Sequence, residues 1–379
     1  MPKVLQNLKD GNKGVVIYGP RQAGKTTLVE DTLAQLGGRV ARINGDQRGS
    51  WQDVILSREI GKLGGFLADY DVLFVDEAQR IPEIGLTLKI ILDNFKRIKV
   101  VATGSSSLDL ASKIGEPLTG RVWTYKLFPV SWGELKDVLG LAQLEDSLEE
   151  RLIFGSYPEL FSTDGLEAKA KYLKDLTDAY LYKDLLEFSG IRNSGKIRDL
   201  LKLLAFQVGS QVSLSELAKS LEISKDTVAR YIDLLEKSFV VFRLKGFNRN
   251  LRKEVVKMDK IFFYDLGVRN TLIGNLNFLS SRDDAGQLWE NFLVVERMKA
   301  MEYAERLYSH YFWRLTSGAE LDLIEEKGGK LTGYEFKWGG KMPKEPKSWV
   351  KTYKTAGFMG VNRDNYHQFT TAQDFILPF

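Results

Sequence analysis

Residues 19–26 carry the residue types that bind nucleotide phosphates. Their sequence, Gly-Pro-Arg-Gln-Ala-Gly-Lys-Thr, fits the pattern of a glycine, four residues and then Gly-Lys-Ser/Thr. A glycine-rich turn at the start of a helix presents backbone N–H groups to an anion. We expect the Lys25 ammonium to reach the β- and γ-phosphates of ATP, and the Thr26 hydroxyl to complete the shell of a Mg²⁺ ion. The predicted ATP-binding residues are Gly19, Pro20, Arg21, Gln22, Ala23, Gly24, Lys25, Thr26 and Thr27.

Two adjacent acidic residues, Asp76 and Glu77, follow the apolar run 72–75. We expect Asp76 to hold Mg²⁺ through water, and Glu77 to orient and deprotonate the water that attacks ATP. An apolar run that ends in Asp-Glu is a weak signal alone, because many strands end in acidic residues. After a phosphate-binding loop, the pair favours hydrolysis over passive nucleotide binding.

Further polar positions are candidates for contact with the γ-phosphate. The apolar run 100–102 ends in Thr103-Gly-Ser105, and either hydroxyl can lie near that phosphate, although a plain turn is an equal alternative. Arg121 lies in a loop before the next predicted strand and is a candidate arginine finger, in its own subunit or in a neighbouring one. A finger given to a neighbour requires a homo-oligomer, and a solvated structural arginine is the alternative.

A second predicted site lies near the C-terminus, in a predicted hairpin. Asp322 lies on its first strand, and Glu335 and Lys337 share one face of the second strand. If the register sets Asp322 opposite them, two carboxylates and an ammonium meet, and Glu290 can add a third acidic ligand from a helix. Such a set can bind Mg²⁺ and position a water for attack on a phosphodiester. Simple charge pairing across the hairpin is the alternative.

Alternating strands and helices must position the phosphate loop. An apolar run precedes the loop, and residues 26–36 after it have helical spacing. More short apolar runs separated by helical stretches predict an α/β fold with a parallel sheet covered by helices. The predicted strands are 14–18, 39–43, 72–75, 99–103 and 122–127.

Residues 196–250 predict a small separate module. Helical patterns over 196–208, 213–222 and 225–237 precede an apolar strand over 239–247, which is the order of a winged helix-turn-helix. Contact with duplex DNA and a structural or protein-docking role are equally compatible with it. The candidate DNA-contacting residues are Lys225, Thr227 and Arg230 for the major groove, and Arg243, Lys245, Arg249, Arg252 and Lys253 for phosphates.

Composition excludes several classes of protein. The chain has 379 residues, enough for two to four domains, and a formal net charge of +4, which permits a nucleic-acid partner without requiring one. It has no cysteine, which excludes disulfides and Cys-ligated zinc, and two histidines, which disfavours a His-rich metal site. We find no apolar stretch of membrane-spanning length and no signal-peptide pattern, so we expect a soluble cytoplasmic protein.

The order of these parts resembles a prokaryotic family with an AAA-type ATPase domain, a winged helix and a C-terminal restriction-endonuclease-like domain. The resemblance implies ATP binding and ATPase activity, without a defined biological role. The segments that carry it are 19–26, 72–79, 103–106, 118–121, 128–135, 155–159, 265–269, 286–292, 319–322 and 335–337. The predicted domains are an AAA-type P-loop ATPase domain (1–135), a helical lid or bridging region (136–195), a winged helix-turn-helix (196–255) and a restriction-endonuclease-like domain (256–379).

The sequence therefore predicts a Mg²⁺-dependent ATPase whose nucleotide state moves the C-terminal modules, acting on double-stranded DNA. The alternative is an ATP-gated switch or scaffold that binds a protein partner and carries an inert nuclease-like domain. A third hypothesis treats the chain as a nuclease in which ATP controls access to the C-terminal site.

Overall fold

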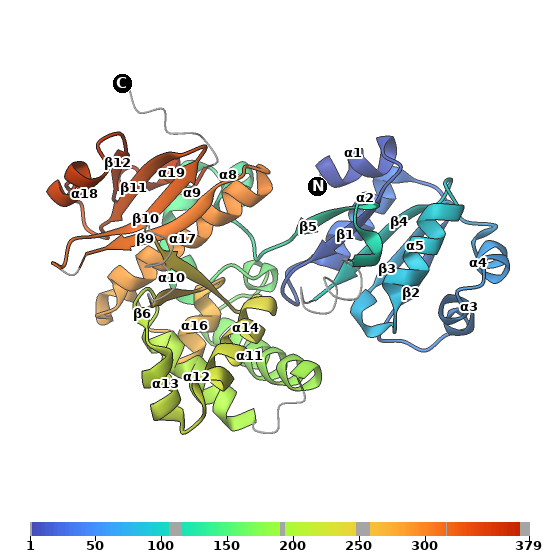
Figure 1. Cartoon of the computed structure of the whole chain (residues 1–379), viewed down its shortest axis with the longest axis horizontal. Helices are drawn as coiled ribbons and strands as arrows, with labels where there is room; N and C mark the ends of the chain where they lie inside the picture. The colour runs from blue at the N-terminus through green and yellow to red at the C-terminus, as the bar shows by residue number, and fades with distance from the viewer. Residues whose placement is uncertain (1, 106–115, 190–193, 248–257, 316, 372–379) are drawn as a thin grey trace. The chain divides into compact units, whose positions relative to one another are not determined.

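The computed structural model describes residues 2–105, 116–189, 194–247, 258–315 and 317–371 (Figure 1). The chain divides into two compact units. Unit 1 comprises Met1–Pro129 with Lys237–Phe239, and unit 2 comprises Val130–Glu236 with Val240–Phe379. This division is coarser than the predicted four domains, so the boundaries between the finer modules stay predictions.

A five-stranded sheet forms the centre of unit 1, in the order β2-β3-β4-β1-β5. Every neighbouring pair is parallel, so the carboxyl ends of all five strands lie at one edge of the sheet. The predicted strands are all present, with ends shifted by at most one residue, and the α/β class with a parallel sheet is confirmed. The bounds are β1 Gly14–Tyr18, β2 Val40–Asn44, β3 Val72–Asp76, β4 Lys99–Gly104 and β5 Val122–Lys126.

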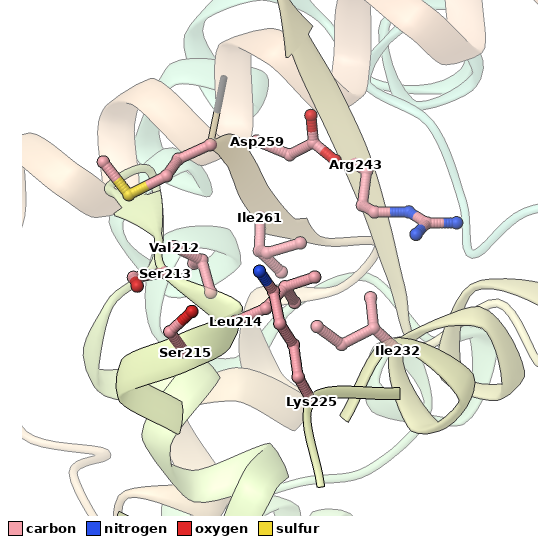
Figure 2. Close-up of a pocket in the computed structure, with 10 residues that line it drawn as sticks. Val212, Ser213, Leu214, Ser215, Lys225, Ile232, Arg243, Asp259 and Ile261 are labelled. Carbon is pink, nitrogen blue, oxygen red and sulfur yellow. The ribbon is translucent and has the colours of Figure 1, made fainter. Parts of the chain in front are cut away.

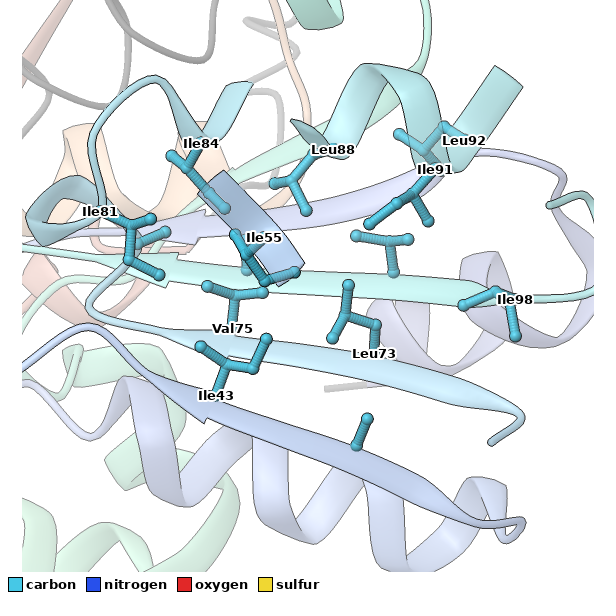
Figure 3. Packing of buried hydrophobic residues seen from close by; sticks show 14 of the residues in the cluster. Ile43, Ile55, Leu73, Val75, Ile81, Ile84, Leu88, Ile91, Leu92 and Ile98 are labelled. Carbon is cyan, nitrogen blue, oxygen red and sulfur yellow. The ribbon is translucent and has the colours of Figure 1, made fainter. Parts of the chain in front are cut away.

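Helices cover both faces of this sheet (Figure 1). Successive strand residues point to opposite faces, so Val15 and Ile17 pack with α1 and α2, whereas Val16 packs with α3, α4 and α5. Figure 3 shows the second cluster, where Leu88 and Ile91 of α5 lie over the sheet. The bounds are α1 Pro2–Asp10, α2 Lys25–Leu36, α3 Trp51–Ser57, α4 Ile60–Leu67, η1 Ala78–Arg80, α5 Ile84–Asn94 and α7 Glu116–Leu118.

Unit 2 begins with a helical stretch that packs on α16 and α17 of the same unit. Asn270 of α16 donates to the carbonyl oxygens at the end of α10 at 2.8 and 3.0 Å, and the Ser156 N–H donates to Asp265 at 2.7 Å. Gly155 has φ +76°, and a Cβ there would lie 2.1 Å from the Asp265 carboxylate, so only glycine fits. Residues 130–135, predicted to end the ATPase domain, belong to this unit. The bounds are α8 Trp132–Val138, α9 Leu141–Asp146, α10 Leu148–Phe154, η3 Pro158–Phe161, α11 Leu166–Ser189, α16 Leu266–Leu272 and α17 Ala285–Tyr303.

The predicted small module has its three helices and the following strand, together with a short strand, β6, between the first two helices that was not predicted. Strand β8 pairs antiparallel with both β6 and β7. The Ser213 side chain accepts from the Glu216 N–H at 3.3 Å and caps α13. The bounds are α12 Ser194–Phe206, β6 Gln211–Val212, α13 Leu214–Leu221, α14 Lys225–Lys237, β7 Val241–Gly246 and β8 Asp259–Phe263. The predicted phosphate contacts Arg249, Arg252 and Lys253 lie outside the described residues.

These strands belong to a seven-stranded sheet in the order β12-β11-β10-β9-β7-β8-β6. The junction is at β7, which pairs antiparallel with β8 on one side and parallel with β9 on the other. The remaining bounds are β9 Ser309–Arg314, β10 Glu320–Lys327, β11 Lys330–Phe336, β12 Gly357–Val361, η4 Leu279–Ser281, α18 Lys347–Thr352 and α19 Tyr366–Phe369. Of the helices in the described ranges, none has the length and apolar character needed to cross a membrane.

Candidate functional site

The predicted phosphate loop connects β1 to α2 at the carboxyl edge of the parallel sheet. Gly19 follows β1, and a Cβ at this position would lie 1.9 Å from the carbonyl oxygen of Leu127. Only glycine therefore lets the chain leave the strand on this path. Thr26 and Thr27 lie in the first turn of α2 and are exposed, so both are open to a ligand at this edge.

Lys25 is the buried member of the loop, with 5% of its surface exposed. Its Nζ donates to the carbonyl oxygens of Gly19 at 2.9 Å and Pro20 at 2.7 Å. A buried ammonium requires such partners, because its desolvation is otherwise costly. The side chain is thus folded over the loop itself, within reach of any anion that the loop binds.

The Thr26 hydroxyl meets the Asp76 carboxylate, although the two residues lie on different elements. Thr26 Oγ1 lies 3.1 and 3.3 Å from the two Asp76 oxygens. Thr103, at the end of β4, also donates its hydroxyl to Asp76. A hydroxyl beside a carboxylate is a donor set that Mg²⁺ accepts, with waters and phosphate oxygens as its other ligands. The residues present therefore fit the predicted ion.

Glu77 is held at both its backbone and its side chain. Its φ of +49° places it in the left-handed region, which is uncommon for a glutamate. The Glu77 N–H lies within hydrogen-bond distance of Asp76 Oδ1 (3.2 Å) and Thr103 Oγ1 (3.3 Å). The carboxylate accepts from Nε2 of Gln79, which also donates to the Ser105 hydroxyl at 3.0 Å. The two candidate hydroxyls at the end of β4, Thr103 and Ser105, are therefore linked to the acidic pair by hydrogen bonds, Ser105 through Gln79.

Arg121 is not near this network, which corrects one of its two predicted roles. It directly precedes β5, and its carbonyl accepts from the N–H of Gly14 at 3.0 Å, at the start of β1. The phosphate loop follows the opposite end of β1, about 13 Å further along a strand of this length. The Arg121 side chain instead donates to Asp93 at 2.8 Å. An arginine finger for its own phosphate loop is therefore wrong for Arg121.

The C-terminal hairpin brings Asp322, Glu335 and Lys337 together. Strands β10 and β11 pair Leu323 with Tyr334. The N–H of Phe336, two residues after Tyr334, donates to Asp322, which precedes Leu323, at 2.8 Å. Lys337 Nζ donates to Glu335 at 3.2 Å. A register shift in β10 between residues 321 and 324, opposite β9, falls at Asp322. Such bulges re-aim a side chain, which fits the position of Asp322 here.

Glu290, the predicted third acidic ligand, has another partner. Its carboxylate accepts from Lys260 Nζ at 2.7 Å, and the same ammonium lies 3.8 Å from Asp322. Lys260 is 5% exposed, lies next to the buried residues Ile261, Phe262 and Phe263 of β8, and was missed by sequence reasoning. A lysine in an apolar run needs a carboxylate partner, which is a signal in the sequence, but the sequence does not say which carboxylate it is. Within the described ranges, no group of three or more His, Cys, Asp or Glu side chains is arranged to hold a metal ion.

Burial and mutual repulsion shape the electrostatics of this cluster. Burial and the nearby Asp322 carboxylate raise the pKa of Glu290 to about 8. The same two causes raise the pKa of Glu335 to about 7. Burial also raises the pKa of Asp322. The cluster therefore takes up protons at neutral pH more readily than exposed carboxylates do.

A pocket of about 320 Å³ lies in the predicted small module (Figure 2). Lys225, a predicted DNA contact, extends along it. Arg243 also lines it, but its guanidinium bonds the carboxylates of Asp233 and Glu236. Two carboxylates therefore compete with a phosphate for this guanidinium, which makes a structural role the alternative for Arg243. The lining residues are Val212, Ser213, Leu214, Ser215, Lys225, Ile232, Arg243, Met258, Asp259 and Ile261.

Comparison with known families agrees with the geometry of unit 1. Residues 11–136 match the family described as AAA domain. Residues 145–278 and 285–376 match two families described as domains of unknown function, DUF8612 and DUF4143. The phosphate loop, the parallel sheet and this match define an AAA-type ATPase domain followed by two further family domains.

Most of the chain is also similar to curated relatives. It is 30% identical over 330 residues to the uncharacterized protein Rv2008c of Mycobacterium tuberculosis, covering 85% of this chain and 70% of the relative. The uncharacterized protein Mb2031c of Mycobacterium bovis matches with the same values. The chain belongs to the family of these two proteins. Among solved structures, the Walker-type ATPase paby2304 of Pyrococcus abyssi gives a TM-score of 0.46 at 16% identity, over 72% of this chain and 93% of that one.

Proposed function

We propose that this protein binds ATP with Mg²⁺ and hydrolyses it. The observation that carries the proposal is the network at the carboxyl edge of the sheet, where Thr26, Asp76 and Thr103 meet beside the phosphate loop. Glu77 is tied to the same network through its N–H and Thr103. A strand-to-helix turn without a ligand does not require two hydroxyls, Thr26 of α2 and Thr103 of β4, to bond the same carboxylate of Asp76.

Each residue has a distinct role in the proposed reaction. The loop N–H groups and Lys25 bind the phosphates, and Thr26 and Asp76 are the residues that would hold Mg²⁺. The ion, when bound, neutralises charge on the phosphate oxygens. Glu77 orients a water molecule and accepts its proton as the water attacks.

The test of this proposal is steady-state ATP hydrolysis by the full chain, compared with a Glu77→Gln variant. Glutamine keeps an oxygen that can accept from Gln79, so we expect nucleotide affinity to hold while kcat falls roughly 10²- to 10⁴-fold. Glu59→Gln is a matched control, because the Glu59 side chain is exposed and its carboxylate accepts from Lys62 at 2.8 Å. Wild-type turnover in Glu77→Gln would refute the role of Glu77, and no hydrolysis by the wild-type chain would overturn the proposal.

We further propose that the predicted small module is a winged helix that contacts double-stranded DNA. The element order α12-β6-α13-α14-β7-β8 supports this, as do the exposed side chains of Lys225 and Arg230 on α14. We expect Lys225→Ala and Arg230→Ala each to reduce the salt dependence of duplex binding by about one unit of slope, with Lys171→Ala on α11 as the control. ATP hydrolysis stimulated by duplex DNA would connect this module to the ATPase. Hydrolysis indifferent to DNA, without duplex binding, would favour an ATP-gated switch or scaffold for a protein partner.

A metal-dependent nuclease site in a restriction-endonuclease-like domain is a second candidate function. One observation favours it: Glu335 Oε2 is buried and has no hydrogen-bond partner in the described part of the chain, which fits a place for a cation. The pairing of Glu290 with Lys260 favours the inert alternative. Nicking of a plasmid with Mg²⁺, lost in both Asp322→Ala and Lys337→Ala, would establish the nuclease. An intact plasmid under all conditions would establish an inert domain.

For Arg121, the remaining proposal is a finger given to a neighbouring subunit. Its pairing with Asp93 lies at the exposed surface, so the guanidinium is accessible to another molecule. In that case the ATPase is a homo-oligomer, and Arg121→Ala lowers hydrolysis without changing ATP affinity. Equal hydrolysis by wild type and variant at all protein concentrations would leave Arg121 as a structural residue.

A further inference from the structure

Gln79 connects the proposed catalytic glutamate to the tip of strand β4. It lies in η1, directly after the acidic pair, and is 3% exposed. Its Nε2 donates to the Glu77 carboxylate and to Ser105 Oγ, the latter at 3.0 Å. Ser105, which follows β4, is 2% exposed. A buried amide that donates to two partners fixes both of them, because leaving either unpaired is costly.

The orientation of the Gln79 side chain follows from the chemistry of its partner. An ionised carboxylate only accepts hydrogen bonds, so the amide nitrogen of Gln79, and not its oxygen, must face Glu77. The hydrogen bond from Gln79 therefore fixes the position of the Glu77 carboxylate.

The backbone of Glu77 is tied to the same strand. Its N–H reaches Thr103 Oγ1 at 3.3 Å, and Thr103 is fully buried on β4. Both ends of Glu77 thus depend on β4, the N–H directly through Thr103 and the carboxylate through Gln79 and Ser105. A displacement of the β4 tip would move the carboxylate as well as the backbone.

We propose that Gln79 is a positioning residue for ATP hydrolysis, which holds the Glu77 carboxylate in line with the β4 tip. The inference rests on the proposed ATPase function and gives a role to a residue outside the phosphate loop and the acidic pair. Gln79 acts through Glu77, so its loss should change kcat while the affinity for ATP holds. The Gln79→Met substitution removes the donor at nearly constant volume.

The experiment measures kcat and KM for ATP on the full chain. We expect kcat to fall roughly 10- to 100-fold in Gln79→Met, the equivalent of one hydrogen bond to a charged group, with KM unchanged. Gln6→Met on α1, where Gln6 is exposed, is the control for the same chemical change.

A role in packing alone predicts different results. It would change stability and leave kcat of the folded variant at its wild-type value, and that outcome overturns the proposal. Ser105→Ala provides a second route: its effect on kcat and that of Gln79→Met should be non-additive in the double variant, since both act on one bonded chain. Additive effects would also overturn the proposal. Absence of hydrolysis in the wild-type chain would instead refute the ATPase function itself, so the two failures are distinguishable.

Discussion

Replacing Lys25 by methionine should loosen the phosphate loop as well as weaken ATP binding. Lys25 donates to two loop carbonyls, of Gly19 and Pro20, from a buried position. Methionine has a similar length and no donor, so both carbonyls lose their partner. The substitution therefore tests whether the phosphate-binding lysine also stabilises the loop.

The expected magnitude follows from these two bonds. Each hydrogen bond from a charged donor contributes about 1.5–3 kcal/mol. Part of that loss is recovered, because a methionine does not carry the desolvation cost of a buried ammonium and water can reach carbonyls near the surface. A net loss of about 2 kcal/mol remains, which corresponds to a roughly 30-fold larger population of the opened state.

The assay is amide hydrogen exchange on the full chain without nucleotide, followed in peptides from β1 and β4. Local opening controls exchange in such strands, so we expect these peptides to exchange up to 30-fold faster in Lys25→Met, by the estimate above. Lys9→Met on α1 is the control, because Lys9 is exposed. Wild-type exchange rates in both strands of Lys25→Met would refute the reasoning, since they would mean that the lysine bonds add nothing to the stability of the loop.

Two further predictions concern unit 2. Arg297 and Glu325 form a buried ion pair with contacts of 2.7 and 2.9 Å. Glu325→Gln leaves a buried guanidinium uncompensated, so it should lower the free energy of unfolding by about 3–5 kcal/mol, measured by urea unfolding followed by tryptophan fluorescence. Glu326→Gln, at the neighbouring residue, is the control and should lower it little. The pKa of Glu290 is raised from 4.5 to about 8 in the folded state. Between these two values the folded protein therefore binds more protons than the unfolded chain. The free energy of unfolding should fall as the pH rises from about 5 to 8. Glu290→Gln should flatten this slope; an unchanged slope would mean that Glu290 does not titrate in this range.

The elements around the phosphate loop were predictable because several constraints coincide there. A buried strand, a glycine turn and an amphipathic helix in succession leave few alternatives, and the structure has all of them at the expected residues. Asp76 could be paired with the loop because parallel strands bring their carboxyl ends to one edge. The role of Gln79 could not be inferred, because it depends on a contact with Ser105 on another strand.

The error at Arg121 and the omission of Lys260 have different physical origins. The position of Arg121 was available in the sequence: a residue that precedes a parallel strand lies at the amino edge, away from the phosphate loop. Lys260 depends on the register of β8 against β7 and on the approach of α17, neither of which is encoded locally. The sequence allowed Glu290 to be chosen as a candidate, because it is an acidic residue on a predicted helix. Its partner, Lys260, could not be predicted, because tertiary packing brings the two together.

Strand β7 has a consequence for how this protein can be divided. It forms backbone hydrogen bonds with β8 on one side and with β9 on the other. The predicted DNA-contacting module and the C-terminal acidic cluster therefore belong to a single sheet. A fragment cut between them would expose unpaired N–H and C=O groups along β7 or β9, the kind of open edge that aggregates. The two therefore share one continuous hydrogen-bonded sheet, and a displacement of one relative to the other would have to break the pairing of β7 with β9.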